Sequence, residues 1–243
     1  MEFYSELKEK FRKILEKENL LNDEVSVITK SLTPEEAIGK TERKDFPILN
    51  GKEIMIEAEY KGNRGQAFTS SPCNYSGSLK EISELDLSDD YNKSIFISSM
   101  NAVLLHLGLI SGNIHCKNEE PEMCAKSMRE YMEENYRGKK VVLVGFQPAM
   151  LENIKEVVDL RVLDLNEDNV NTEKYGVMIE DGVEKYEEAV LDWADAVLCT
   201  GSTVLNGSIV NFIDIGKPVI FYGTSISGTA YLMNLTRLCY YPG

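Results

Sequence analysis

The pattern of hydrophobic and polar positions predicts a mixed first half of the chain. Apolar residues recur at helical spacing from Phe3 to Leu15, with charge on the opposite face, which predicts an amphipathic helix over residues 1–18. A short apolar alternation over residues 25–28 predicts a strand. Thr33 is followed by a proline and, three positions on, by Glu36, which is the sequence of a helix start with a capping box. That short helix should end near Gly39.

A hairpin and two longer helices are predicted next. Residues 53–60 alternate between apolar and polar side chains, residues 61–66 have the composition of a turn, and residues 67–69 return as a second strand. An apolar helix capped by Ser88 is expected over residues 89–107, at the centre of the fold. A further helix opens at Glu120 and stops at Gly138.

The pattern changes after residue 138. Unbroken apolar runs at residues 141–144, 161–163, 196–199 and 218–222 are typical of strands covered on both faces. Helix-forming segments separate them, at residues 150–158, 183–194, 204–215 and 227–235. This alternation predicts an α/β protein with a small α+β domain over residues 1–138 and a parallel-sheet domain over residues 139–243.

Composition and charge narrow the classes of function. The 243 residues include 26 basic and 40 acidic side chains, and the formal net charge is −14. Nucleic acids and anionic membranes both attract basic surfaces, so neither is an expected partner. The sequence shows neither a signal-peptide core nor an apolar run long enough for a membrane helix, and we expect a cytoplasmic protein. Five cysteines are an odd number, which argues against a disulfide framework.

Three strand ends of the predicted parallel sheet carry small or polar residues. Ligands of such sheets lie beyond the carboxyl ends of the strands, where the strand order reverses. The candidate ligand-binding residues at these ends are Gly145, Gln147, Thr200, Gly201, Ser202, Thr203, Asn206, Gly223 and Thr224. Capping of the following helix would explain any one of these turns. Three turns that converge favour a binding crevice.

The known nucleotide-binding motifs match poorly. The stretch that starts at Gly145 has one glycine where a dinucleotide fingerprint has three, and no P-loop is present. Asp164 lies about 20 residues further on, where a ribose-binding acid would lie. A single matching acid is weak support, because aspartate ends many strands.

Candidate metal ligands cluster in the first half of the chain. His115, Cys116 and Cys124 offer an imidazole and two thiols, which suit zinc, iron or copper, although their spacing matches no standard finger. Packing of the cysteines is an equally weighted alternative. His106 is expected to be a hydrogen-bonded core residue, and Cys199 a packing residue in a strand. Whether Cys73 joins a metal site is left open.

Several segments together resemble the putative heavy-metal-chelation family. The segments are residues 34–48, the glycine-containing stretch at residues 61–69, residues 114–125 and residues 200–207. The resemblance implies a domain like the N-terminal domain of enolases followed by a Rossmann-like domain, with the site in the cleft between them. It also implies metal handling linked to anaerobic cobalamin synthesis. Enolase chemistry is not implied, because no set of magnesium-binding acids is present.

Three hypotheses follow for the function. The preferred one is a protein that handles a transition metal or a metallocofactor, with its ligand between Gly65, Gln66, the loop of His115 and the strand ends. The alternative is an enzyme that uses a nucleotide-like, pterin or S-adenosylmethionine-like molecule in the crevice. The third is a non-catalytic sensing or scaffold module. A homodimer is left open, because Tyr240 and Tyr241 fit an interface as well as a packed tail.

Overall fold

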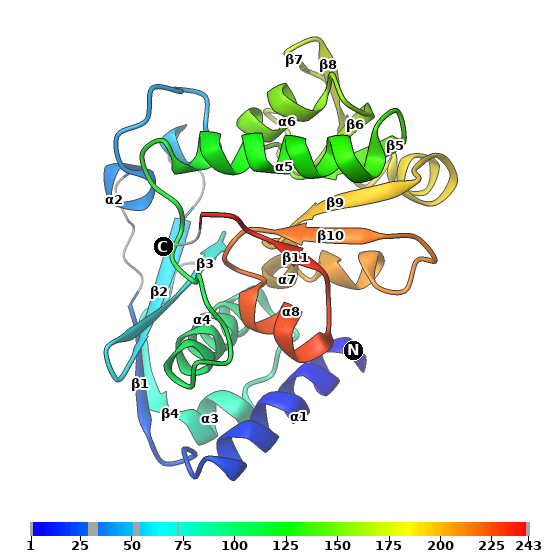
Figure 1. Cartoon of the computed structure of the whole chain (residues 1–243). Helices are drawn as coiled ribbons and strands as arrows, with labels where there is room; N and C mark the ends of the chain where they lie inside the picture. Colours follow the sequence, from blue (N-terminus) through cyan, green and yellow to red (C-terminus); the bar gives the residue numbers. More distant parts are fainter. Residues whose placement is uncertain (1, 29–33, 51–53, 72, 242–243) are drawn as a thin grey trace.

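The computed structural model describes residues 2–28, 34–50, 54–71 and 73–241 (Figure 1). The predicted cap at Thr33 lies outside the described residues. Over these ranges, no helix combines the length and the apolar character that crossing a membrane would need.

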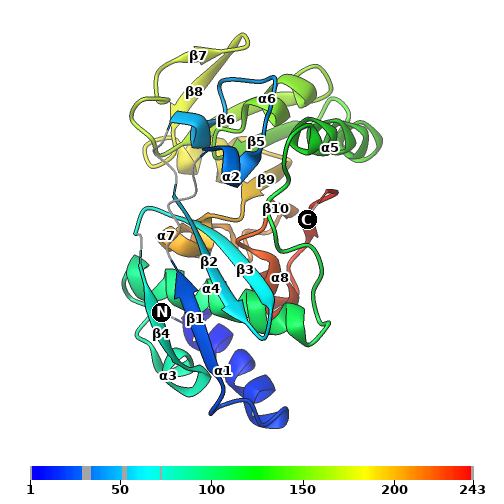
Figure 2. The same cartoon turned by 90° about the vertical axis from the view of Figure 1, so that its left-hand side faces the viewer.

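A four-stranded antiparallel sheet forms the first layer. Its strands are β1 (Glu24–Ile28), β2 (Ile54–Tyr60), β3 (Asn63–Thr69) and β4 (Tyr75–Ser78), in the order β3-β2-β1-β4 (Figure 2). The turn between β2 and β3 consists of Lys61 and Gly62, with φ of 48° and 79°. Positive φ at both positions matches the right-handed twist of the paired strands. The predicted hairpin is confirmed, but the predicted turn over residues 61–66 is too long, because β3 begins at Asn63 and pairs with β2 from there.

Helix α4 (Asp90–His106) packs on this sheet, α3 (Leu79–Glu84) adjoins β4, and α1 (Glu2–Lys17) packs against α3. The apolar stripe of α1 is buried, as predicted. Every residue of α4 from Lys93 to Leu104 is buried, because β2 and β3 pack on one side of the helix and later helices on the other. A helix with this environment carries apolar residues all round, which is what the sequence shows. The helix cap is Asp89, whose side chain accepts a hydrogen bond from the Asn92 amide, so the prediction of Ser88 as the cap is wrong.

His106 departs from its prediction. It lies at the exposed end of α4, where its ring contacts Tyr60 edge-on and its Nδ1 lies 3.0 Å from Nδ2 of Asn63. The hydrogen bond is as expected, but the core position is wrong. The chain leaves the core one turn earlier than the apolar pattern indicates, because Leu105 and Leu107 are only half-buried.

A second sheet has six parallel strands and one antiparallel edge strand. The strands are β5 (Lys140–Val144), β6 (Asp159–Asp164), β7 (Glu173–Lys174), β8 (Val177–Asp181), β9 (Ala196–Thr200), β10 (Val219–Tyr222) and β11 (Arg237–Leu238). Their order is β11-β10-β9-β5-β6-β8-β7, with only β7 antiparallel to its neighbour. Counted along the parallel strands, this is the order 3-2-1-4-5-6 of doubly wound sheets. The order reverses between β5 and β9.

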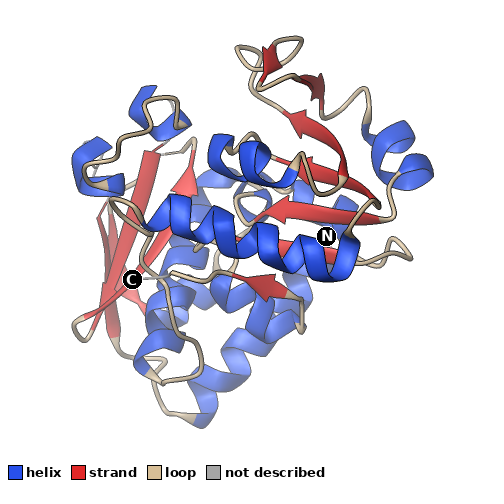
Figure 3. Ribbon diagram, turned by 45° about the horizontal axis from the view of Figure 1, so that its top comes forward, coloured by secondary structure: helices blue, strands red, loops and turns tan. Residues whose placement is uncertain are grey.

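Helices lie on both faces of the parallel sheet, which confirms the predicted α/β class. Helix α5 (Glu120–Tyr136) lies across one face and packs with α6 (Pro148–Ile154) (Figure 3). Val141 and Leu143 point into this layer, whereas Val142 joins the core around α4. The remaining helical segments are α2 (Pro34–Ile38), η1 (Pro47–Asn50), η2 (Glu187–Trp193), α7 (Thr203–Asn206), η3 (Ser208–Phe212) and α8 (Ser227–Met233).

Packing between the two halves is interleaved. Helix α5 precedes residue 139 yet covers the parallel sheet, while α7 and α8 come after it and pack against α4. The domain boundary at 138/139 stays a prediction. The single helix expected over residues 204–215 is two short segments, because Gly207 has a φ of 82° and ends α7.

Candidate functional site

A cavity of about 950 Å³ lies at the carboxyl edge of the parallel sheet. This volume is in the range of pockets that bind small molecules. The lining includes strand ends of β5, β6, β9 and β10, the loop that precedes α5, and residues from α2 and η1. Of the residues singled out in the sequence, it includes His115, Cys116, Cys124, Gly145, Gln147, Asp164, Thr200, Gly201, Ser202, Thr203, Asn206, Gly223 and Thr224.

The cavity extends along the sheet edge. Cys239 follows β11 at one end, and Asp164 ends β6 at the other, with three strands between them. Since neighbouring strands are about 4.8 Å apart, the two ends are separated by roughly 19 Å.

The turn after β5 is built by the chain itself. Gly145 has a φ of 87°, and a Cβ there would come within 2.8 Å of the Thr200 side chain. The Gln147 side chain caps α6 by accepting a hydrogen bond from the Met150 amide at 2.6 Å. Pro148 follows and has no N–H to donate.

Asp164 ties the two neighbouring turns together. Its Oδ2 accepts from the Phe146 amide at 2.5 Å, and its Oδ1 accepts from the Asn166 amide at 2.6 Å. A carboxylate has about four acceptor positions, so each oxygen keeps one for a ligand.

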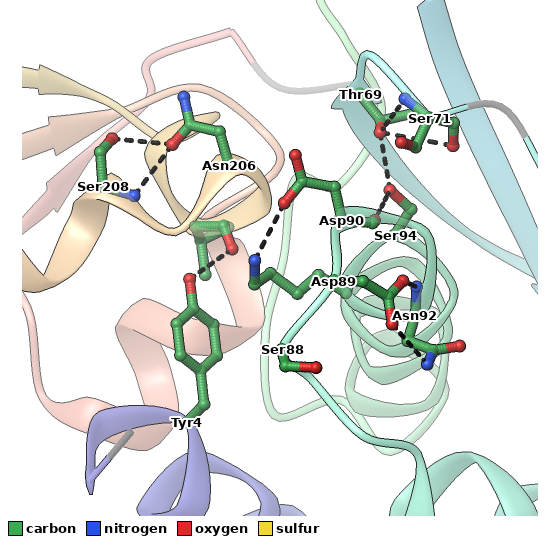
Figure 4. Close-up of polar contacts among 12 residues, drawn as sticks. Tyr4, Thr69, Ser71, Ser88, Asp89, Asp90, Asn92, Ser94, Asn206 and Ser208 are labelled. Atoms are coloured by element: carbon green, nitrogen blue, oxygen red, sulfur yellow. Dashed lines mark hydrogen bonds and ion pairs between the residues drawn. The ribbon is translucent and has the colours of Figure 1, made fainter.

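Hydroxyl and amide groups cluster after β9. The Thr200 and Ser202 hydroxyls lie 3.0 Å apart, and the Thr203 hydroxyl donates to the Thr200 carbonyl. Asn206 Oδ1 accepts from the amide and hydroxyl of Ser208, while its amide nitrogen points away from Ser208 (Figure 4). These contacts are local turn contacts and not the helix capping that the sequence offered as an alternative, because Ser202 at the start of α7 makes no side-chain cap hydrogen bond. The same side chains line the cavity.

The opposite end of the cavity is rich in sulfur. Cys116 and Cys124 line it as the sequence suggested, and Cys239 lines it too. The sequence reasoning missed Cys239, because it ended the sheet at β10. The chain adds the two-residue strand β11 beside β10, in register Tyr222 with Leu238, which brings Cys239 to the sheet edge.

Burial controls the protonation of these thiols. It raises the pKa of Cys116, with a further rise from Cys124 and Cys239 nearby. Burial also raises the pKa of Cys124 and the pKa of Cys239. Hydrogen bonds from the backbone amides of Tyr240 and Tyr241 offset part of the rise at Cys124, and the charge of Arg237 offsets part of the rise at Cys239. The thiols are therefore neutral near pH 7, and Cys124 and Cys239 also have neighbouring groups that favour a thiolate.

The raised thiol pKa values predict a loss of stability in alkali. Above about pH 8.5 an unfolded chain loses thiol protons that the native state keeps, so rising pH favours unfolding by up to ~1.4 kcal/mol per pH unit for each thiol. We expect the free energy of unfolding, measured with denaturant under reducing, metal-free conditions, to fall between about pH 8.5 and 10. Cys116→Ala should make this fall shallower, and an unchanged slope in that variant would contradict the assignment.

The loop that carries His115 is held from the antiparallel sheet. Gln66 Oε1 accepts from the His115 amide at 2.8 Å, and Gln66 Nε2 donates to Glu57 at 2.8 Å. The rings of His115 and Phe68 meet edge-on, with centroids 5.1 Å apart. Gly65 and Gln66 do not line the cavity among the described residues: Gly65 lets β3 approach α4, and Gln66 positions the loop.

The segment before β2 covers the cavity from the side. Ile38, Phe46 and Ile48 line it. Arg43 anchors this segment by ion pairs with Glu122 of α5 and Glu152 of α6. The cover is thus attached to the helices of the parallel sheet.

The other cysteines have different surroundings. Cys199 is fully buried in β9, which confirms its packing role, and Cys73 is buried in the core around α4 and does not line the cavity. Over the ranges that the structure describes, no three His, Cys, Asp or Glu side chains stand in a ready-made arrangement for a metal ion. Thiols and an imidazole nevertheless fit a soft metal by their chemistry.

Two solved structures are similar to this protein. The chain resembles the crystal structure of a protein of unknown function from Pyrococcus horikoshii, with 15% identity over 92% of this chain and 79% of that one and a TM-score of 0.56. A second structure, from Desulfitobacterium hafniense, has 13% identity, covers 74% of this chain and 72% of its own, and has a TM-score of 0.49. No curated protein matches the chain. At this identity the first likeness shows a shared fold.

The sequence family of these two proteins also matches this chain directly. A model of the family described as "Putative heavy-metal chelation" matches residues 129–235. That range contains the strand ends, Asp164 and residues 200–207, but not Cys116, Cys124 or Cys239. The chain therefore matches this family through residues 129–235, and the resemblance that its sequence motifs indicated is confirmed.

Proposed function

We propose that the cavity binds a small molecule together with a soft transition-metal ion. The observation that carries this proposal is the meeting of Cys116, Cys124 and Cys239 at one end of a cavity that runs along the sheet edge. The thiols come from a loop, a helix and the end of a strand, so the tertiary fold alone brings them together. The family's description agrees with metal binding.

The two ends of the cavity have different tasks in this proposal. The thiols bind the metal, with His115 beside them, and lose their protons to it. The Arg237 guanidinium and the amides of Gly223, Tyr240 and Tyr241 stabilise the thiolates that form. The hydroxyl and amide groups at the strand ends bind the organic part. Since the side chains do not form a complete ligand set, the bound molecule supplies the remaining donors.

Cobalt titration tests the metal end. In wild-type protein, Co²⁺ should produce the absorption of cobalt–thiolate charge transfer, and affinity should increase with pH because binding releases thiol protons. Replacing Cys116, Cys124 or Cys239 with serine should each weaken binding by roughly tenfold or more, since each removes a soft ligand.

Cys73→Ala is the matched control, because Cys73 is a buried thiol away from the cavity. It should leave cobalt binding unchanged, and circular dichroism should show that every variant is folded. Equal binding by the triple serine variant and the wild type would refute the metal end.

Three further expectations stay predictions. These are a role in anaerobic cobalamin synthesis, a cytoplasmic location and a homodimer. Binding of a nucleotide-like, pterin or S-adenosylmethionine-like molecule remains the alternative for the organic part, and the geometry of the Asp164 end bears on it directly.

A further inference from the structure

An acid stands where a doubly wound sheet binds ribose. In sheets of the order 3-2-1-4-5-6, a carboxylate at the end of the second strand accepts hydrogen bonds from ribose hydroxyls. Asp164 ends β6, which is that strand, and it is the only acidic side chain among the described residues of the cavity lining. Each of its oxygens accepts one backbone amide and keeps an acceptor position for a diol.

The place where such sheets hold a phosphate lacks two of its usual donors here. That place is the first turn after the first strand, where free helix amides meet the pyrophosphate. In this chain the Gln147 side chain takes the Met150 amide, and Pro148 has no N–H. The described lining residues include no Lys or Arg, so a phosphate would lack a charged partner as well.

Apolar surface flanks the carboxylate. Leu165 and Val183 are 55% and 75% exposed and both line the cavity, one after β6 and one after β8. Gly182 lets these two turns approach, since a Cβ there would lie 3.2 Å from the Leu165 side chain. A flat heterocyclic base placed between Leu165 and Val183 would bury both side chains. Asn166 and Asn169 also line the cavity and add polar side chains to it.

We propose that the Asp164 end of the cavity is a subsite for a nucleoside without phosphate. Asp164 accepts the ribose hydroxyls, and the base lies against Leu165 and Val183. The charge of the subsite favours a neutral or cationic ligand, such as a nucleoside with an uncharged or sulfonium tail that extends toward the thiols. This inference rests on the proposed function only in taking the cavity as a small-molecule site, and it does not depend on the metal.

Calorimetric titration with adenosine, 2′-deoxyadenosine and AMP tests the subsite, in reducing buffer without metal. Adenosine should bind and AMP should bind more weakly. Asp164→Asn should weaken adenosine binding by roughly tenfold to a hundredfold, the range for hydrogen bonds to a charged group. The wild type should bind 2′-deoxyadenosine more weakly than adenosine by a similar factor. Asp164→Asn should bind the two nucleosides equally, because loss of the hydroxyl and loss of the carboxylate remove the same contact.

Glu167→Gln is the matched control, since it removes a negative charge from the same loop without lining the cavity. It should change adenosine affinity less than twofold, as roughly expected for an exposed charge. Gln147→Gly frees the Met150 amide and should improve AMP binding relative to adenosine. Tighter binding of AMP than adenosine by the wild type, or full adenosine affinity in Asp164→Asn, would overturn the inference.

The cobalt titration separates the two proposals. Cysteine-dependent cobalt binding without adenosine binding removes the nucleoside subsite and leaves the metal proposal standing. If adenosine binding requires Asp164 and cobalt binding is unchanged by the cysteine substitutions, the nucleoside subsite stands and the metal proposal is removed.

Discussion

Replacing Asn101 with alanine should lower the free energy of unfolding by roughly 3 kcal/mol, the upper range for leaving buried polar groups unpaired. Asn101 is fully buried in α4. Its Oδ1 accepts from the Gly228 amide at 2.8 Å, and its Nδ2 lies 3.3 Å from the Gln66 carbonyl and 3.2 Å from the Ser225 carbonyl. One side chain thus connects the central helix to β3 and to the segment that precedes α8.

Urea denaturation of Asn101→Ala measures this loss. Asn92→Ala is the control on the same helix, because Asn92 is only half-buried and its side chain donates to the nearby Asp89 at the helix cap. It should cost clearly less. Alanine has a higher helix propensity than asparagine, so propensity cannot cause a loss in either variant. The same loss in both variants would contradict the role given to the buried network.

Asn101 also shows where prediction from the sequence ends. The apolar run over residues 89–107 predicts a buried central helix, and the structure has one. Within that run, an asparagine reads as an interruption of a hydrophobic pattern. Its role depends on Gln66 and Ser225, which are 35 and 124 positions away. Local pattern identifies the element, but partners this distant in sequence are known only from the fold.

The candidate site likewise has parts that local sequence predicts and parts that it does not. Its strand ends were predictable, because a buried parallel strand followed by glycine and a hydroxyl has a local signature. The cluster of three thiols was predictable in part. Cys116 and Cys124 lie near a histidine in sequence, whereas Cys239 lies far from both. A two-residue strand such as β11 has too few positions to show any alternation, so its register beside β10 was out of reach.

The prediction for Gly65 and Gln66 was limited in a different way, because their local sequence does not show what they face. Gly65 and Gln66 were assigned to the ligand from their place in a motif, yet the structure gives them packing and loop-holding contacts. A glycine followed by a polar residue reads alike whether it faces a ligand or a helix. Only the distance from β3 to α4 distinguishes these two cases.

That distance makes Gly65→Ala the substitution with the second large expected effect. A Cβ at this position would lie 2.1 Å from the Ser98 carbonyl oxygen and 2.4 Å from the Ala102 amide nitrogen. Both atoms belong to the backbone of the buried helix α4, so no side-chain rotation relieves the contact. Overpacking against a rigid neighbour should cost roughly 3 kcal/mol or more in the free energy of unfolding.

Gly62→Ala is the control in the same hairpin. A Cβ at Gly62 meets no atom within 4 Å, and its φ of 79° makes alanine only conformationally strained there. That strain should cost about 1 kcal/mol, and denaturant titration of both variants gives the comparison. Ala102→Gly should not rescue Gly65→Ala, because the obstacle is the helix backbone and not the Ala102 methyl group. A rescue, or equal losses at Gly62 and Gly65, would show that α4 can move away from β3, and the loop that Gln66 holds would then lack a fixed support.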